Sequence, residues 1–287
     1  LAELNPCLVM LSTCNQGQTG PRAAQPGFGS QLTALSGFTH LLGEPDRTPV
    51  LLYGPYIDYI AVGYGTIAVL AALVQRRRTG RGVHIDLSQY EAGLQFLAPA
   101  LLDYFANGHV ASRQGNRHPS AVPHGVYPCR GEERWCALSV WSDSEWRSFS
   151  EAMGCPQWAS DPRFATVLGR KRHEADIDAD VAEWTRARDR DEVVAVLRQR
   201  GLRAAPVNSM ADLFTDPQLR LYAWRPVEHP VLGNVHVMAP TFLLRETPPE
   251  VRRPAPLLGE HTREVLSGLL GLDEAEIFLL ESQGVLE

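Results

Sequence analysis

Residues 58–87 read DYIAVGYGTIAVLAALVQRRRTGRGVHIDL, and their pattern indicates the fold class of the chain. The apolar run 59–74 predicts a helix, and three arginines followed by Gly80 form a strong stop signal, because cations and glycine favour a helix C-terminus. Residues 83–87 then have the pattern of a buried strand. The apolar run is shorter than the ~20 residues that a bilayer needs. We therefore expect a buried core helix and no membrane partner.

The same alternation extends on both sides of this stretch. We expect a strand at 7–14, a helix at 29–41 broken by Gly37, a strand at 50–53 and a helix at 89–107. Strands that alternate with helices predict a mainly parallel α/β sheet. The turn-rich loop 15–21 would lie at the sheet edge where ligands bind in such folds. Residues 1–108 are thus predicted to form one α/β region, which the family resemblance described below assigns to the first segment of a large domain.

The pattern changes after residue 108. Residues 109–123 are interpreted as a linker, 124–215 as a smaller α+β domain, and 216–287 as a proline-rich return with two C-terminal helices. Within the small domain we expect a hairpin of 125–129 and 134–140, a helix from Ser142 or Asp143 to about Met153, and amphipathic helices near 170–187 and 190–200.

Composition narrows the classes of function. The 287 residues carry a net charge of −6 and are 44% hydrophobic. An acidic chain without a clustered basic face argues against nucleic acid as a partner. The five cysteines are odd in number and form no CxxC pair. Free thiols in a reducing, cytoplasmic compartment are the plain interpretation, and no metal site is expected.

Asp58 is the first candidate for chemistry. It follows the turn Gly54-Pro55 and precedes the apolar helix. An aspartate in this place is most often a helix cap. A carboxylate at a helix N-terminus is also stabilised as the anion, and an ionised carboxylate can attack an activated acyl group. Both roles can hold at once.

Two other features invite a functional interpretation. The glycines of the segment 76–82 follow a helix instead of preceding one, and the segment lacks the P-loop pattern, so we interpret it as structural. His118 and His124 lie near the expected domain boundary. They are either solvated loop residues or part of a substrate cleft, since clefts often form between domains.

Several short motifs together resemble family III (CaiB/BaiF-type) CoA-transferases. The motifs are Leu4-Asn5-Pro6, Gly17-Gln18-Thr19-Gly20-Pro21, Pro26-Gly27-Phe28, Ser36-Gly37, Gly54-Pro55-Tyr56-Ile57-Asp58, Arg78-Thr79-Gly80-Arg81-Gly82, Ile85-Asp86-Leu87-Ser88-Gln89-Tyr90-Glu91 and Gly115-Asn116-Arg117-His118-Pro119. The resemblance covers nearly the whole chain, but such proteins have an additional N-terminal third.

This resemblance implies a Rossmann-like, parallel-sheet large domain built from both ends of the chain, a smaller α+β domain and an interlocked dimer. It implies Asp58 as the catalytic residue. Contacts to substrate or CoA are expected from Phe28, Gly54, Tyr56, Tyr59, Gln89 and His124. Coenzyme A would enter as an acyl-CoA substrate, with no tightly bound cofactor. A small carboxylic acid, and a second identical or related chain, would be the partners.

The implied reaction moves CoA from an acyl-CoA to an acid through an aspartyl anhydride and an aspartyl-CoA thioester. Position 29 holds glycine, where some relatives have an acidic residue. One alternative is a racemase-like isomerase, which needs an acid/base pair at the substrate α-carbon. The racemases have His in place of Phe28, and Phe cannot move protons. Another alternative is a non-catalytic scaffold half of a transferase complex.

Overall fold

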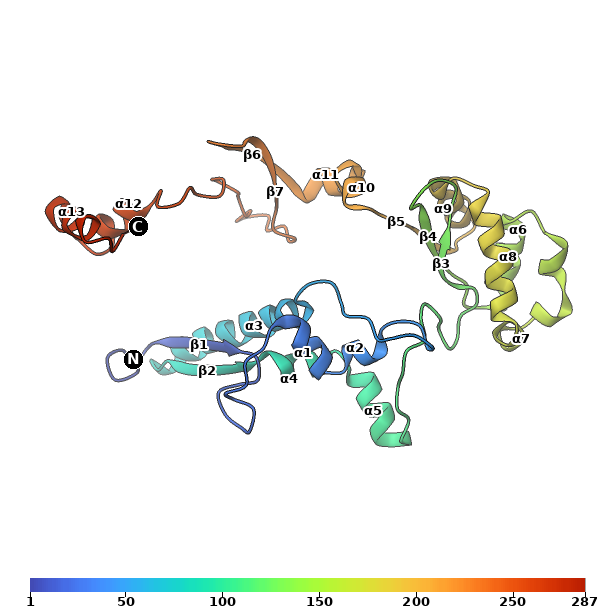
Figure 1. Cartoon of the computed structure of the whole chain (residues 1–287), viewed down its shortest axis with the longest axis horizontal. Helices are drawn as coiled ribbons and strands as arrows, with labels where there is room; N and C mark the ends of the chain where they lie inside the picture. The colour runs from blue at the N-terminus through green and yellow to red at the C-terminus, as the bar shows by residue number, and fades with distance from the viewer. Residues whose placement is uncertain (287) are drawn as a thin grey trace. The chain divides into compact units, whose positions relative to one another are not determined.

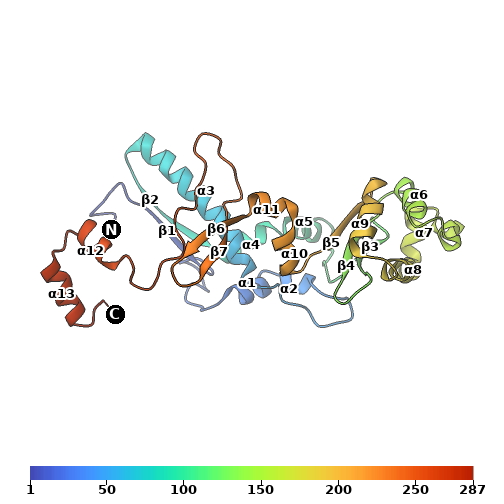
Figure 2. The same ribbon diagram turned by 90° about the horizontal axis from the view of Figure 1, so that it is seen from above.

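The computed structural model describes residues 1–286 and has mixed α/β architecture, with one parallel and two antiparallel sheets. The first elements along the chain are β1 (Val9–Cys14), α1 (Gly29–Leu35), α2 (Phe38–Leu41), α3 (Tyr56–Thr79), β2 (Val83–Ser88), α4 (Gln89–Gln95) and α5 (Ala98–Asn107). Figures 1 and 2 both draw α3 alongside the pair β1–β2.

The parallel sheet is formed by β1 and β2, which pair in register from Val9 with Val83 to Cys14 with Ser88. The alternation expected from the sequence is confirmed here. Helix α3 lies close against the sheet at Gly65, where a side chain would meet Leu11 and Leu87. Parallel strands joined by a helix end at the same edge, so the loops after β1 and β2 leave the sheet together.

Two glycines fix the chain at the C-terminal end of α3. Gly80 has the left-handed conformation (φ 69°) and its N–H donates to the Arg76 carbonyl, so the predicted stop signal is confirmed. Gly82 packs against the backbone of Leu8, and a Cβ there would stand well inside the 3.0 Å that real Cβ atoms keep. The arginine-glycine segment therefore serves the fold of this region.

By length and composition alone, α3 qualifies as a candidate membrane span, and it is the one such helix among residues 1–286. Of its most apolar 18-residue window, 28% is buried. Ile57, Ile60 and Ala61 pack in a small core with Leu32 and Ala92. The expectation of a core helix thus holds for one face of α3, and much of the rest of α3 is exposed within the unit Leu1–Val207.

Three local predictions can be compared directly with the structure. The helix at 29–41 is broken at Gly37, as expected, because that residue has φ 96°. The helix predicted over 89–107 is two helices, since Pro99 cannot continue α4 and instead lies in the first turn of α5. The strand predicted at 50–53 is wrong: these residues form an exposed loop and pair with no strand of residues 1–286.

The next part of the chain builds an antiparallel sheet covered by helices. Its elements are β3 (His124–Pro128), β4 (Trp135–Ser139), α6 (Asp143–Ala152), η1 (Gln157–Ser160), η2 (Pro162–Phe164), α7 (Val167–Arg172), α8 (Glu174–Arg186), α9 (Arg190–Gln199) and β5 (Arg203–Val207). The strands are ordered β3-β4-β5. The predicted hairpin and the α6 helix are confirmed, and Ser142 caps α6 by accepting the Glu145 N–H.

The core of this part lies between one sheet face and the helices. Phe149, Ile177, Val181, Val193 and Leu197 are its fully or almost fully buried helix residues. They alternate with polar residues at helical spacing, and this pattern explains why the amphipathic stretches were recognisable in the sequence. Figure 1 draws β3 and β4 beside α8 and α9.

Residues beyond β5 form a separate set of elements. They are α10 (Met210–Thr215), α11 (Pro217–Tyr222), β6 (Trp224–His229), β7 (Gly233–Met238), α12 (Thr262–Gly268) and α13 (Glu274–Ser282). The two C-terminal helices were expected, whereas the antiparallel β6–β7 pair within the proline-rich return was not. Contacts group Leu1–Val207 in one compact unit and Asn208–Glu287 in a second. The large domain built from both ends of the chain stays a prediction.

Candidate active site

Asp58 lies in the first turn of α3, directly after a tight turn. Gly54 has the left-handed conformation (φ 73°), and Pro55 occupies the N-cap position of the helix. Ile57, the neighbour of Asp58, is fully buried and contacts α4 closely at Gly93. This packing fixes the start of α3, so the Asp58 backbone is held by the fold.

The Asp58 carboxylate is not used as a cap. Its Oδ2 atom is buried and has no hydrogen-bond partner in the described structure, and the N-cap Pro55 provides none. No cation within residues 1–286 forms an ion pair with it. The capping interpretation is therefore wrong, although Asp58 does lie in the first turn of α3. Buried polar atoms without partners cost free energy, and they often mark functional sites.

Gly29 lies against the same carboxylate. A Cβ at position 29 would come much closer than 3.0 Å to Asp58 Oδ2 and to Pro55. The N-terminal turn of α1 therefore reaches Asp58 only because residue 29 has no side chain. An acidic side chain at this position, as in some relatives, has no room in this arrangement.

A cavity of about 440 Å³ opens beside Asp58. It is lined by Leu11, Thr13, Asp58, Ala61, Val62, Gly65, Thr66, Val69, Leu70, Leu87 and Gln89. The lining is mostly apolar, and most of its polar groups lie near the carboxyl ends of the strands. Such a cavity, with a few converging polar groups, has the character of a small-molecule site.

Gln89 is the second predicted site residue in this cavity. It follows β2 directly and begins α4, at the carboxyl edge of the parallel sheet. Its Nε2 donates a long hydrogen bond of 3.4 Å to Thr13 Oγ1, and its Oε1 is buried without a partner. Asp58 and Gln89 thus each present an unpartnered oxygen to one cavity. Thr13 was not singled out in the sequence, although its place near the end of β1 is a usable signal.

The loop after β1 is held by β2. Asp86 accepts the Gln18 N–H at 2.9 Å, and Tyr90 N–H donates to the Asn15 carbonyl. Gln16 Oε1 in this loop is a further buried oxygen without a partner. These bonds hold the first residues of the loop, 15–18, at the strand edge, whereas residues 18–26 are exposed.

The remaining predicted site residues have other surroundings. Phe28 and Tyr59 are 79% and 68% exposed, and neither lines the Asp58 cavity. Tyr56 packs edge-on against Phe38 at 5.6 Å. Gly54 forms the turn before α3. Their assignment to the substrate site stays a prediction.

His124 lies on β3, in a different cavity from Asp58. Its Nδ1 donates to the Asn116 carbonyl at 2.6 Å, and its ring lies 5.4 Å from the His118 ring. A role of His124 in a substrate cleft stays a prediction. Within the described part of the chain, no group of three or more His, Cys, Asp or Glu side chains could hold a metal.

Comparison with known proteins places this geometry in a family. Residues 1–262 match the family model that is described as CoA-transferase family III. The chain is 32% identical to the succinyl-CoA–D-citramalate CoA-transferase of Chloroflexus aurantiacus, over all of this chain and 71% of that protein. It is 34% identical to the succinyl-CoA–L-malate CoA-transferase beta subunit of the same organism, again over all of this chain and 71% of the relative.

A solved structure has the same fold. The crystal structure of a CAIB/BAIF family protein from Brucella suis aligns with a TM-score of 0.85 and 29% identity, over 93% of this chain and 69% of that one. The match over residues 1–262 and the relatives above 30% identity agree with the motifs recognised in the sequence. The chain therefore belongs to the enzymes of CoA-transferase family III.

Proposed function

We propose that Asp58 is the nucleophile of a CoA-transferase that moves CoA from an acyl-CoA to a carboxylic acid. The observation that carries the proposal is the buried, unpartnered Asp58 Oδ2 in a largely apolar cavity. A carboxylate oxygen that accepts no hydrogen bond from its own protein keeps its nucleophilic electron pair for a substrate.

The proposed reaction has four steps that balance. The Asp58 carboxylate attacks the donor thioester carbonyl, which gives a mixed anhydride and CoA thiolate. The thiolate attacks the aspartyl carbonyl and releases the donor acid, which leaves an aspartyl-CoA thioester. The acceptor carboxylate attacks this thioester, forms a second anhydride and expels the thiolate. The thiolate then attacks the acceptor carbonyl, which yields the new acyl-CoA and free Asp58.

Gln89 supports the charged states of this sequence. Each attack places negative charge on a carbonyl oxygen, and fixed donors near that oxygen lower the barrier. The Nε2 group of Gln89 is held only by the long bond to Thr13, so it can turn to such an oxyanion. Backbone N–H groups at the first turn of α3 are further donors.

The relatives support a class of substrate. Those described above are named for succinyl-CoA and for D-citramalate or L-malate, which are short dicarboxylic acids. We propose succinyl-CoA as the donor and a short dicarboxylate as the acceptor. A relative named a beta subunit supports a second chain as partner. The exposed part of α3 supports the same proposal.

The test traps the covalent intermediate. The chain is incubated with succinyl-CoA, quenched with hydroxylamine and analysed by peptide mass spectrometry, with Asp58→Ala as control. We expect a hydroxamate on the peptide that contains Asp58 and none in the variant. The absence of any adduct with succinyl-CoA or a panel of other acyl-CoAs would favour the scaffold alternative. Efficient α-proton exchange without an adduct would favour the racemase alternative.

A further inference from the structure

The sheet β3-β4-β5 has one face buried and one face open. Tyr127, Cys136, Leu138 and Ala204 point into the helical core and are buried. Because successive side chains alternate across a strand, the residues between them belong to the opposite face. No helix of the unit Leu1–Val207 covers that face, and a cavity of about 540 Å³ lies on it.

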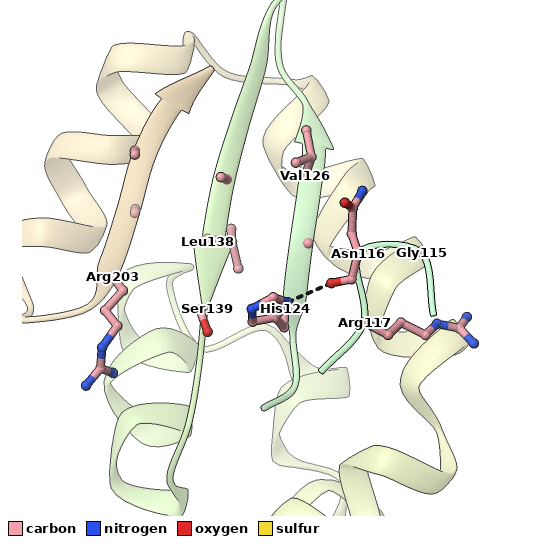
Figure 3. Close-up of a pocket in the computed structure, with 12 residues that line it drawn as sticks. Gly115, Asn116, Arg117, His124, Val126, Leu138, Ser139 and Arg203 are labelled. Carbon is pink, nitrogen blue, oxygen red and sulfur yellow. Dashed lines mark hydrogen bonds between the residues drawn. The ribbon is translucent and has the colours of Figure 1, made fainter. Parts of the chain in front are cut away.

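A row of three polar residues crosses this open face. His124 on β3 pairs with Ser139 on β4, and Ser139 pairs with Arg203 on β5. All three line the cavity. Figure 3 shows the Ser139 hydroxyl between His124 and Arg203 on neighbouring strands. The row results from strand register, since these residues are far apart in sequence.

The Ser139 hydroxyl is the unusual member of the row. Its Oγ atom is buried and has no hydrogen-bond partner among residues 1–286. A hydroxyl can both donate and accept, and one that is left unpaired inside a protein is costly. Its place at the cavity wall indicates that the missing partner is a ligand.

Arg203 is positioned for this ligand by α6. Its Nη1 donates to Glu145 Oε1 at 2.7 Å, and its guanidinium lies 5.9 Å from the Trp141 ring centroid. Glu145 is itself held, because its Oε2 accepts a hydrogen bond from the Trp141 backbone N–H at 2.8 Å. A guanidinium has five N–H donors in a fixed plane, so the bond at Nη1 leaves donors for a second carboxylate.

Small apolar side chains complete the lining of the cavity. His124 is oriented by its bond to Asn116, and the His118 and Trp141 rings lie 4.6 Å apart beside it. The next row across the sheet is Val126, Ala137 and Ala205, which are paired in register. This row offers a short apolar floor beside the polar row, as the methylene chain of a small acid requires.

We infer that the open face of this sheet binds the carboxylate of a short-chain acid between the Ser139 hydroxyl and the Arg203 guanidinium. The methylene groups of the acid lie on Val126, Ala137 and Ala205. The inference rests on the proposed function only for the identity of the acid, a substrate of the transfer reaction. The observations that carry it are the unpartnered hydroxyl, the oriented arginine and the cavity they share.

The test measures succinate binding to the full chain by isothermal titration calorimetry at constant ionic strength. Succinamide, which has the same length and no charge, is the ligand control. We expect succinate to bind and succinamide not to bind. Arg203→Gln should weaken succinate binding about tenfold or more, and Ser139→Ala about threefold or more, because bonds to a charged group are the stronger ones.

Arg200→Gln is the matched control variant. Arg200 also reaches a glutamate of α6, at 2.5 Å from Glu151, but it does not line the cavity. We expect its succinate affinity to stay within about twofold of the parent. Because Ser139 Oγ has no partner, Ser139→Ala should leave the melting temperature unchanged or higher, so lost binding cannot be attributed to unfolding.

Three outcomes would overturn the inference: no succinate binding to the parent chain, equal binding of succinamide, or unchanged affinity in both Arg203→Gln and Ser139→Ala. The hydroxylamine test on the parent chain separates this inference from the proposed function. In the parent chain, succinate binding without any hydroxamate on Asp58 would contradict the mechanism and leave the site intact. A hydroxamate on Asp58 without succinate binding at Arg203 would do the reverse.

Discussion

At the scale of single residues, Gly29 and Asp58 are a mutually dependent pair. Gly29→Ala would place a methyl group against Asp58 Oδ2 and Pro55, so α1 or the start of α3 must shift. We expect transfer activity to fall at least tenfold and the melting temperature to drop, as in other overpacked sites. Activity assays and thermal unfolding check both effects.

Gly63→Ala is the control for that substitution. Gly63 lies within α3, and a Cβ there would meet no atom within 4 Å. Alanine is a better helix former than glycine by about 1 kcal/mol, so this variant should be as stable as the parent or more stable. Equal behaviour of the two variants would contradict the close contact at Gly29.

We expect the Gln89 amide to contribute to transfer activity and not to the stability of the fold. Its buried Oε1 has no partner, so Gln89→Met, which keeps the shape and removes the amide, should not lower the free energy of unfolding. The same change should reduce kcat/KM for transfer about tenfold or more if the amide stabilises an oxyanion. Urea unfolding measures the free energy of unfolding, and steady-state kinetics measure kcat/KM. Unchanged kinetics would remove Gln89 from the proposed mechanism.

At the scale of elements, α6 and α7 are joined through a buried arginine. Arg170 on α7 is fully buried, donates to Asp143 at 2.9 Å and to the Phe164 carbonyl, and lies 5.2 Å from the Trp146 ring. Burial lowers the pKa of Arg170, and the Asp143 carboxylate opposes that shift.

Asp143→Ala would leave this guanidinium buried without its counter-ion. We expect a loss of ~2 kcal/mol or more in the free energy of unfolding, measured with urea. Glu250→Ala is the control, because its pair with Arg252 is exposed and should contribute less than ~1 kcal/mol. Equal losses would show that burial does not decide the strength of the Asp143 pair.

The contact between β3 and α8 should depend on pH. Tyr127 donates to Asp178 at 2.6 Å, and burial raises the pKa of both groups. Because the folded-state pKa of Asp178 lies above its unfolded value, the folded chain binds the extra proton. The Asp178 carboxyl therefore contributes most to the stability of the folded chain at low pH. This contribution to the free energy of unfolding is lost as pH rises through the raised pKa.

The variant Asp178→Asn removes that titration and keeps an acceptor for Tyr127. We expect the stability of the parent relative to the variant to be highest near pH 4 and to decline toward neutral pH. Urea unfolding of both proteins across this range checks the sign. A difference that grows with pH would mean that the hydrogen bond outweighs burial.

At the scale of the whole molecule, the open face of α3 predicts association. Val62, Ile67, Leu70 and Val74 lie on this helix and are each about half exposed or more. Exposed apolar surface of this kind marks interaction sites. We expect analytical ultracentrifugation to detect a dimer or a larger species, and the double variant Ile67→Glu, Leu70→Glu to dissociate it.

Leu168→Glu provides the comparison for this pair of changes. Leu168 on α7 is exposed to a similar degree but is isolated from the α3 face. Its substitution should leave the sedimentation unchanged. A monomeric parent chain, or equal dissociation by both sets of changes, would contradict a role for α3 in assembly.

The features that could be predicted from the amino-acid sequence are local in origin. The span of α3 and its end at Gly80, the strands β1 and β2, the β3–β4 hairpin and the capped start of α6 follow from periodicity, turn residues and caps, which act over a few positions. Asp58 could be singled out for the same reason, since its signal is the turn and helix next to it. The family followed from short motifs in order.

What surrounds each of these residues was decided by the tertiary structure. Gly29, Thr13 and Gln89 meet at Asp58 from three separate segments, and no local pattern encodes such a meeting. The row His124–Ser139–Arg203 depends on strand register, where a slip of one residue would turn every side chain to the other face. Long-range packing sets that register, and it therefore decides which polar groups remain free for a ligand.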